Sequence, residues 1–158
     1  MGQFKAEKNQ SGGELVIRLI GHIDEDATFN GLGLDGASKI TLELEGVSAI
    51  NSCGIREWIK WVRTAPDSAE VVYKKCPKVI VDQINMVSGF LPNNGKVESF
   101  FVPYYADASG AEKMVLFSEG KEFKGQEVFP PGEVKDESGE VMEMDVIEAK
   151  YFKFLHKA

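Results

Sequence analysis

The side chains that could carry catalysis in this chain are few and lie far apart. His22 stands two residues from Asp24, and His156 lies near the C-terminus. A hydrolytic triad needs a nucleophile, a histidine base and a group that orients the base, and no nucleophile motif accompanies either histidine. A glycine spacing of the dinucleotide-binding kind occurs at 31–36, but no clear strand and crossover helix flank it. We therefore expect no enzymatic activity and no bound cofactor.

Two cysteines, Cys53 and Cys76, are the remaining candidates for chemistry. They are two short of the four ligands of a thiolate zinc site and far below the density of a disulfide scaffold. Cys53 stands at the predicted start of a helix, which favours a reactive thiolate, and Cys76 ends the next parallel strand toward the same sheet edge. A Cys53/Cys76 thiol sensor is one hypothesis, and two buried residues without a redox role are the other.

The balance of charges argues against several kinds of partner. The 158 residues contain 18 Lys and Arg against 25 Asp and Glu, which gives a formal net charge of -7 at pH 7. Binding to nucleic acid or to anionic lipid depends on basic side chains near phosphates, so we expect neither partner. The sequence has no apolar run of about 20 residues, and residues 1–12 lack the apolar centre of a secretory leader. The expected location is the cytoplasm.

The first part of the chain predicts strands. Residues 3–8 and 14–20 form the two arms of a hairpin, and alternation in the second arm predicts burial on both of its faces. Residues 39–44 predict a third strand, which Gly46 closes. Between the second and third of these strands, the acidic residues 24–26 predict the start of a short helix, because carboxylates suit a helix N-terminus.

An amphipathic helix follows the third strand. Apolar residues recur at the i, i+3, i+4 and i+7 spacing, at Ile55, Trp58, Ile59 and Val62. Ser52 stands where an N-cap belongs, since its hydroxyl can accept a hydrogen bond from a first-turn amide, and Pro66 ends the helix. Residues 70–75 then predict a strand, and Pro77 opens a second helix through about Val87. Strand, helix and strand imply parallel pairing, so the expected fold is α/β, with helices packed against a mixed sheet.

Two segments resemble the STAS family, named for sulphate transporters and anti-sigma factor antagonists. Residues 44–55, Leu-Glu-Gly-Val-Ser-Ala-Ile-Asn-Ser-Cys-Gly-Ile, are similar to the family pattern D-L-S-x-V-x-x-I-D-S-S-G-L. Residues 19–24, Leu-Ile-Gly-His-Ile-Asp, are similar to its second-strand pattern L-x-G-x-L-D. The resemblance covers about residues 3–91. It implies a STAS-like sheet and a bacterial regulatory module that binds proteins.

The resemblance also implies a switch. In anti-sigma factor antagonists of this family the serine of the motif, here Ser52, is phosphorylated by a kinase partner, which ends or prevents a complex. The implied partner is an anti-sigma factor or a kinase-like protein. The implied contact residues are those of the motif and its helix, with Trp61 as a partly exposed side chain: Asn51, Ser52, Cys53, Gly54, Arg56 and Trp61.

Two positions depart from the family pattern. Asn51 replaces the usual Asp, and Cys53 replaces a Ser. Asn keeps the hydrogen-bonding ability of Asp but loses its charge, so a partner that needs the carboxylate would not recognise this loop. The alternative is that Ser52 only caps the helix and Gly54 only permits close packing, and the sequence leaves both interpretations open.

The second half differs in character, with clustered aromatic residues and Gly/Pro turns. The polar stretch Leu91–Lys96 predicts a boundary, so we expect a first domain at 1–91, a linker at 92–96 and a small β-rich domain at 97–158. Within the last segment, Asp145–His156 has near-helical apolar spacing. This helix either caps the second domain or packs on the first, and a homodimer contact through it is a further alternative.

The turns of the second half resemble the two knuckles of a zinc ribbon. They lie at 106–110 and 135–139, on either side of a hairpin near Glu119–Gly120. The positions that would hold the four cysteines are Ala106, Ser109, Lys135 and Ser138, none of which is a competent zinc ligand. We expect a ribbon without metal, held by aromatic packing. For the whole chain, two further hypotheses are a phosphorylation-independent scaffold and a domain that binds a small ligand.

Overall fold

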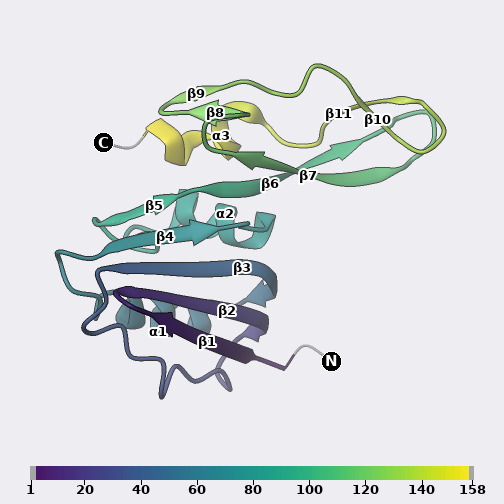
Figure 1. Cartoon of the computed structure of the whole chain (residues 1–158). Helices are drawn as coiled ribbons and strands as arrows, with labels where there is room; N and C mark the ends of the chain where they lie inside the picture. Colours follow the sequence, from purple (N-terminus) through teal and green to yellow (C-terminus); the bar gives the residue numbers. More distant parts are fainter. Residues whose placement is uncertain (1–2, 157–158) are drawn as a thin grey trace.

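Two main sheets share one hydrophobic core in the computed structural model, which describes residues 3–156 (Figure 1). The first half of the chain forms a five-stranded sheet in the order β1-β2-β3-β4-β5. The second half forms a four-stranded sheet in the order β10-β11-β6-β7 and a two-stranded ribbon, β8-β9. The chain is therefore a mixed α/β protein, as the sequence predicts.

The five-stranded sheet combines one hairpin with parallel strands. β1 pairs antiparallel with β2, and β2, β3, β4 and β5 are parallel to one another. Their bounds are Lys5–Ser11, Glu14–Ile23, Lys39–Ile50, Glu70–Lys74 and Gly95–Val97. The two-residue turn of the hairpin places Gly12 at φ 60°, a left-handed conformation that glycine adopts without strain. β3 runs past Gly46, the predicted end, because irregularities in its pairing with β2 let the ladder continue.

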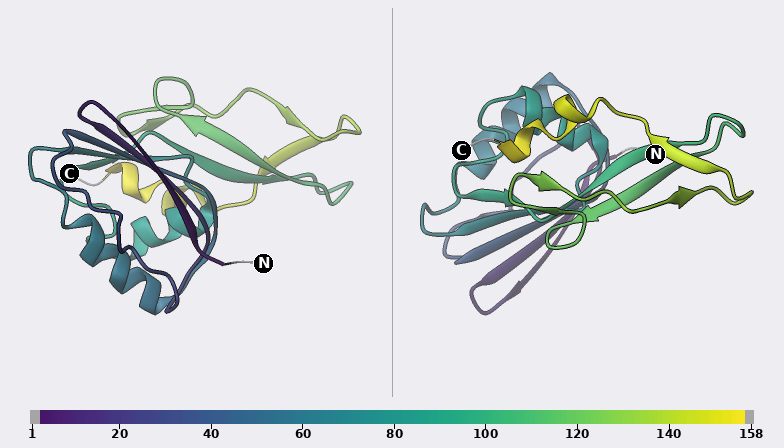
Figure 2. Two further views of the ribbon diagram at one scale, coloured as in Figure 1. Left: turned by 60° about the horizontal axis from the view of Figure 1, so that its bottom comes forward. Right: turned by 90° about the horizontal axis from the view of Figure 1, so that it is seen from above.

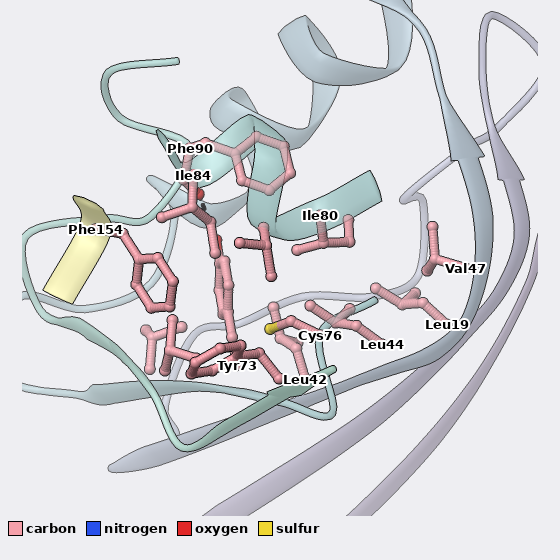
Figure 3. Packing of buried hydrophobic residues seen from close by; sticks show 14 of the residues in the cluster. Leu19, Leu42, Leu44, Val47, Tyr73, Cys76, Ile80, Ile84, Phe90 and Phe154 are labelled. Carbon is pink, nitrogen blue, oxygen red and sulfur yellow. Dashed lines mark hydrogen bonds between the residues drawn. The ribbon is translucent and has the colours of Figure 1, made fainter. Parts of the chain in front are cut away.

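Helix α1 (Ser52–Val62) follows β3, and helix α2 (Lys78–Met86) follows β4. The predicted helix from Ile55 and the one that Pro77 opens are confirmed, and both pack on the same side of the curved sheet (Figure 2). Figure 3 shows Ile80 and Ile84 of α2 pointing toward Leu42 and Tyr73 of the sheet. Within residues 3–156, no helix has the length and apolar character needed to cross a membrane.

The other face of the five-stranded sheet carries charged residues in rows across the strands. One row joins neighbours of alternating sign: Glu7, Arg18, Glu43 and Lys74. On β2, Val16 and Ile20 point to this side and are only half-buried. The prediction that this strand is buried on both faces is therefore wrong, because both crossover helices lie on one side.

The second half contains the predicted β-rich part. Its strands are β6 (Ser99–Tyr105), β7 (Glu112–Ser118), β8 (Phe123–Lys124), β9 (Glu127–Val128), β10 (Val134–Lys135) and β11 (Val141–Met144). The expected linker at 92–96 overlaps strand β5, which pairs with β4 and completes the first sheet. The sequence missed this strand because three residues are too short to show a period. Cys76 and Phe100 form a bridge that connects the two halves directly.

The C-terminal segment forms α3 (Glu148–Tyr151) and a 3-10 turn, η1 (Lys153–His156). Its side chains pack around Phe100 of β6, and its backbone is fixed by Asn85 of α2. Asn85 Nδ2 donates to the carbonyl oxygen of Tyr151 at 2.9 Å, and Asn85 Oδ1 accepts from the backbone amide of Phe154 at 2.9 Å. This segment thus covers the second sheet and also packs on the first half.

Candidate functional site

The loop between β3 and α1 is held by the side chain of Asn51. Asn51 Oδ1 accepts a hydrogen bond from the amide of Gly54 at 2.9 Å, and the amide of Asn51 donates to the carbonyl oxygen of Ile23 at 3.2 Å. The predicted N-cap, Ser52, is wrong by one residue. Asn caps helices as well as Ser does. The helix begins at Ser52 because the side chain of Asn51, the residue before it, accepts the hydrogen bond from the Gly54 amide.

Gly54 lies against the end of β2 with no space for a side chain. A Cβ atom built on Gly54 would stand 1.9 Å from the carbonyl oxygen of Ile23 and 2.6 Å from its carbonyl carbon. Helix α1 therefore begins in direct backbone contact with the neighbouring strand. This contact fixes where the first turn of the helix, including Ser52, sits on the molecule.

Ser52 is exposed on that first turn, and Cys53 beside it is half-buried. Arg56 and Lys60 follow on the same face at one-turn intervals, and both are exposed. They share Glu57 as an ion-pair partner, with nitrogen to oxygen distances of 3.9 Å for Arg56 and 3.6 Å for Lys60. The outward face of α1 thus offers a hydroxyl followed by a row of cations.

Glu25 adds a carboxylate to this loop, which sequence reasoning missed. Asn51 Nδ2 donates toward both carboxylate oxygens of Glu25, at 3.3 and 3.5 Å. The predicted short helix at 24–26 does not form; these residues make a turn after β2. The usable signal was topological: β2 and β3 are parallel neighbours, so the residues that follow their carboxyl ends meet at one edge of the sheet.

Trp61 does not belong to an exposed contact surface. Its side chain is 7% exposed, its ring stacks on Phe29 at 4.5 Å, and its indole N–H donates to the carbonyl oxygen of Leu32 at 2.8 Å. The expectation of a partly exposed Trp61 is wrong because the segment at 24–38 folds over this side of α1. Helical periodicity cannot reveal a cover that comes from a distant segment.

The two cysteines occupy different environments. Cys76 is fully buried in the core, and this burial raises the pKa of its thiol. Figure 3 shows it near Tyr73 and Leu44. A buried neutral thiol is a poor nucleophile, so this environment does not favour the thiol-sensor hypothesis. Both cysteines are free in the structure.

The two histidines lie on separate elements, His22 at the end of β2 and His156 at the end of η1, and both are exposed. No group of three or more His, Cys, Asp or Glu residues within 3–156 is arranged to hold a metal ion.

The two ribbon-like turns meet through hydrogen bonds. The hydroxyl of Ser109 in the first turn donates to the carboxylate of Asp136 in the second. The same carboxylate accepts from the hydroxyl and amide of Ser138 and from the amide of Glu140. The Ser109 hydrogen bond, followed by those from Ser138, lowers the pKa of Asp136 to about 2. Of the four knuckle positions, Ala106 is buried and Ser109, Lys135 and Ser138 are exposed.

A groove of about 560 Å³ lies between α2, the end of β11 and α3. Its lining includes two strongly exposed apolar side chains, Met86 and Ile147, and the cations Lys78 and Lys150. The volume is in the range of small-molecule sites. It is the feature that best matches the small-ligand hypothesis.

Neither a protein-family model nor a curated protein sequence matches this chain.

Proposed function

We propose that this chain is a regulatory module similar to the anti-sigma factor antagonists of the STAS family. Its partner, an anti-sigma factor or kinase-like protein, docks on the loop at 51–54 and the outward face of α1. The observation that carries the proposal is the placement of Ser52, which is exposed on a first helical turn that the Gly54 contact holds rigidly against β2. A rigid turn at a sheet edge suits recognition by a second protein, since little ordering is needed on binding.

Phosphorylation of Ser52 is the proposed switch. A base of the kinase removes the hydroxyl proton, Oγ attacks the γ-phosphorus of a nucleoside triphosphate, and the bond to the nucleoside diphosphate breaks. The product carries about 1.5 to 2 negative charges at a helix N-terminus, where the helix dipole tolerates them. At an interface the same charges must lose their water, and each 1.4 kcal/mol of that cost weakens binding about tenfold.

The first prediction concerns the modification itself. A tagged chain produced in its native cells is expected to carry the mass of one phosphate in a fraction of the molecules. The Ser52→Ala variant loses this species, because no other hydroxyl has the same position on α1. Ser48→Ala, which removes another exposed serine from the neighbouring strand, keeps it. Intact-mass spectrometry measures all three, and a chain without phosphate on Ser52 contradicts the switch.

A pull-down with the same tagged chain decides between the switch and a scaffold. A partner retained by the unmodified chain is expected to bind at least about 100-fold more weakly when phosphoserine occupies position 52, which corresponds to a desolvation and repulsion cost of about 2.8 kcal/mol. Equal retention by the unmodified chain, Ser52→Ala and the phosphoserine form selects the phosphorylation-independent scaffold instead.

We also propose that the second half has the architecture of a zinc ribbon without its metal. The contact between the turns at 106–110 and 135–139 supports this, since a ribbon brings two such turns around one ion. The second prediction follows: a variant with cysteines at Ala106, Ser109, Lys135 and Ser138 binds one Co²⁺ in a tetrahedral thiolate site, seen in the ligand-field absorption.

The control for this prediction keeps Ser109 and carries the other three cysteines. It is expected to bind Co²⁺ at least about tenfold more weakly, because a tetrahedral site then lacks one thiolate. If the four-cysteine variant is folded and gives no tetrahedral Co²⁺ spectrum, the ribbon architecture is wrong.

A further inference from the structure

We propose that a phosphate on Ser52 rearranges two charge contacts within the chain: it draws Arg56 away from Glu57 and drives Glu25 away from Asn51. The residues at 24–28 then loosen from the start of α1. The proposal rests on the proposed function for its biological setting, because it concerns the same serine. Its physical basis is the arrangement of charges around the first turn of α1.

Arg56 is positioned to receive the phosphate. It stands four residues after Ser52 on the same face of α1, and side chains at this spacing are neighbours. Its present contact with Glu57 is long, 3.9 Å from Nε to Oε2, and the side chains of Arg56 and Glu57 are 67% and 45% exposed. Such surface pairs contribute little to stability, whereas a guanidinium and a phosphate form strong, two-pronged hydrogen bonds. Glu57 keeps Lys60 as its partner when Arg56 leaves.

Glu25 is positioned to be repelled. Its carboxylate lies 3.3 Å from the side-chain nitrogen of Asn51, the residue before Ser52. Asn51 cannot move away, because its oxygen caps the Gly54 amide and its backbone amide bonds to Ile23. A phosphate dianion one residue away therefore acts on Glu25, the member of the pair that lies on the segment at 24–28. The N-cap of α1 stays intact while the contact between the two loops breaks.

The segment at 24–38 is held in two parts, which limits the movement. The part near Phe29 and Leu32 is anchored on Trp61 by ring stacking and by the indole hydrogen bond. The part at 24–28 contacts the start of α1 through Glu25. Its own hydrogen bonds are short-range, such as those from the Ala27 amide to the Asp24 carbonyl oxygen and from the Asn30 amide to the Thr28 hydroxyl, and Ala27 packs, partly buried, against the core. Phosphorylation is thus expected to release 24–28 and leave the anchored part in place.

This release changes the surface beside Ser52 in one step. Three consecutive acidic residues, Asp24, Glu25 and Asp26, move with the loop, and Arg56 is neutralised by the phosphate. A partner that docks on the outward face of α1 in the unmodified chain therefore meets a different loop position and a different charge pattern once Ser52 is phosphorylated.

The test installs phosphoserine at position 52 during translation and uses the full chain. Amide hydrogen exchange at 24–28 is expected to rise about fivefold on phosphorylation, the size expected for losing one weak surface contact, while 29–34 stays unchanged. In Glu25→Gln this rise disappears, because a neutral amide is not repelled. Glu7→Gln, which removes a carboxylate on the outer sheet face, keeps the rise. The Nε–H NMR signal of Arg56 is expected to shift downfield with phosphate present.

Two results overturn the proposal: no rise at 24–28 in the phosphorylated chain, or an equal rise in Glu25→Gln. An Arg56 signal that does not respond to the phosphate overturns the part that concerns Arg56. Because the phosphate is installed directly, these outcomes do not depend on a kinase. Failure of the proposed function shows itself separately, as a chain from native cells without phosphate on Ser52.

Discussion

Replacing Gly54 by alanine is expected to lower the free energy of unfolding by about 3 kcal/mol or more, although alanine is the better helix former. The added methyl group would stand 1.9 Å from the carbonyl oxygen of Ile23, a backbone atom that no rotamer change can move. Either α1 shifts outward or the end of β2 bends. Urea unfolding followed by the fluorescence of Trp58 and Trp61 measures the loss.

Gly33→Ala is the matched control, since a Cβ atom there meets nothing within 4 Å and the backbone is not left-handed. We expect this variant to be as stable as the original chain or slightly more stable. If Gly54→Ala also unfolds at the original urea concentration, the tight contact between α1 and β2 is not what fixes the Ser52 turn.

Replacing Phe100 by alanine is expected to cost about 3 to 5 kcal/mol. Phe100 is fully buried and lies among five other rings, with centroid distances from 5.1 Å to Phe154 to 6.3 Å to Tyr151. Its removal leaves a cavity where β6, the β8-β9 pair and the C-terminal segment meet. The same urea titration, followed by the fluorescence of Trp58 and Trp61, measures the loss of stability in the first half, away from the substituted residue.

This variant also tests whether the two halves unfold together. Because one core cluster includes residues from both halves, we expect a single transition that moves as a whole. Phe129→Ala, which truncates a ring that is 49% exposed, is expected to change the midpoint little. If Phe100→Ala leaves the urea midpoint of the tryptophan fluorescence transition unchanged, the second half unfolds independently of the first.

The local patterns in the sequence predicted the elements of the first half well. The apolar spacing from Ile55 to Val62 predicted α1, because a helix that covers a sheet must carry a periodic apolar face, and Pro77 predicted the start of α2. The hairpin followed from strand alternation around Gly12. The acidic run at 24–26 failed as a helix signal, because carboxylates suit a helix start but do not create one without apolar periodicity.

Two of the errors at the candidate site have a common origin. Trp61 is buried and Glu25 joins the site because of contacts with the segment at 24–38, through Leu32, which is 29 residues from Trp61, and Glu25, which is 26 residues from Asn51. Patterns within one helix carry no information about such neighbours. The shift of the N-cap from Ser52 to Asn51 is local, since Asn51 caps the amide of Gly54 three residues on.

The amino-acid sequence by itself determined the α/β character of this protein, its helix positions and the presence of a serine at the start of α1, because these follow from hydrophobic periodicity and turn chemistry over short stretches. The tertiary structure alone decided which side chains surround that serine and how the two halves join. Strand β5, the contact between Glu25 and Asn51, and the clamp of Asn85 on the C-terminal segment all bring together distant residues. Their formation depends on the packing of the whole core and leaves no local signature.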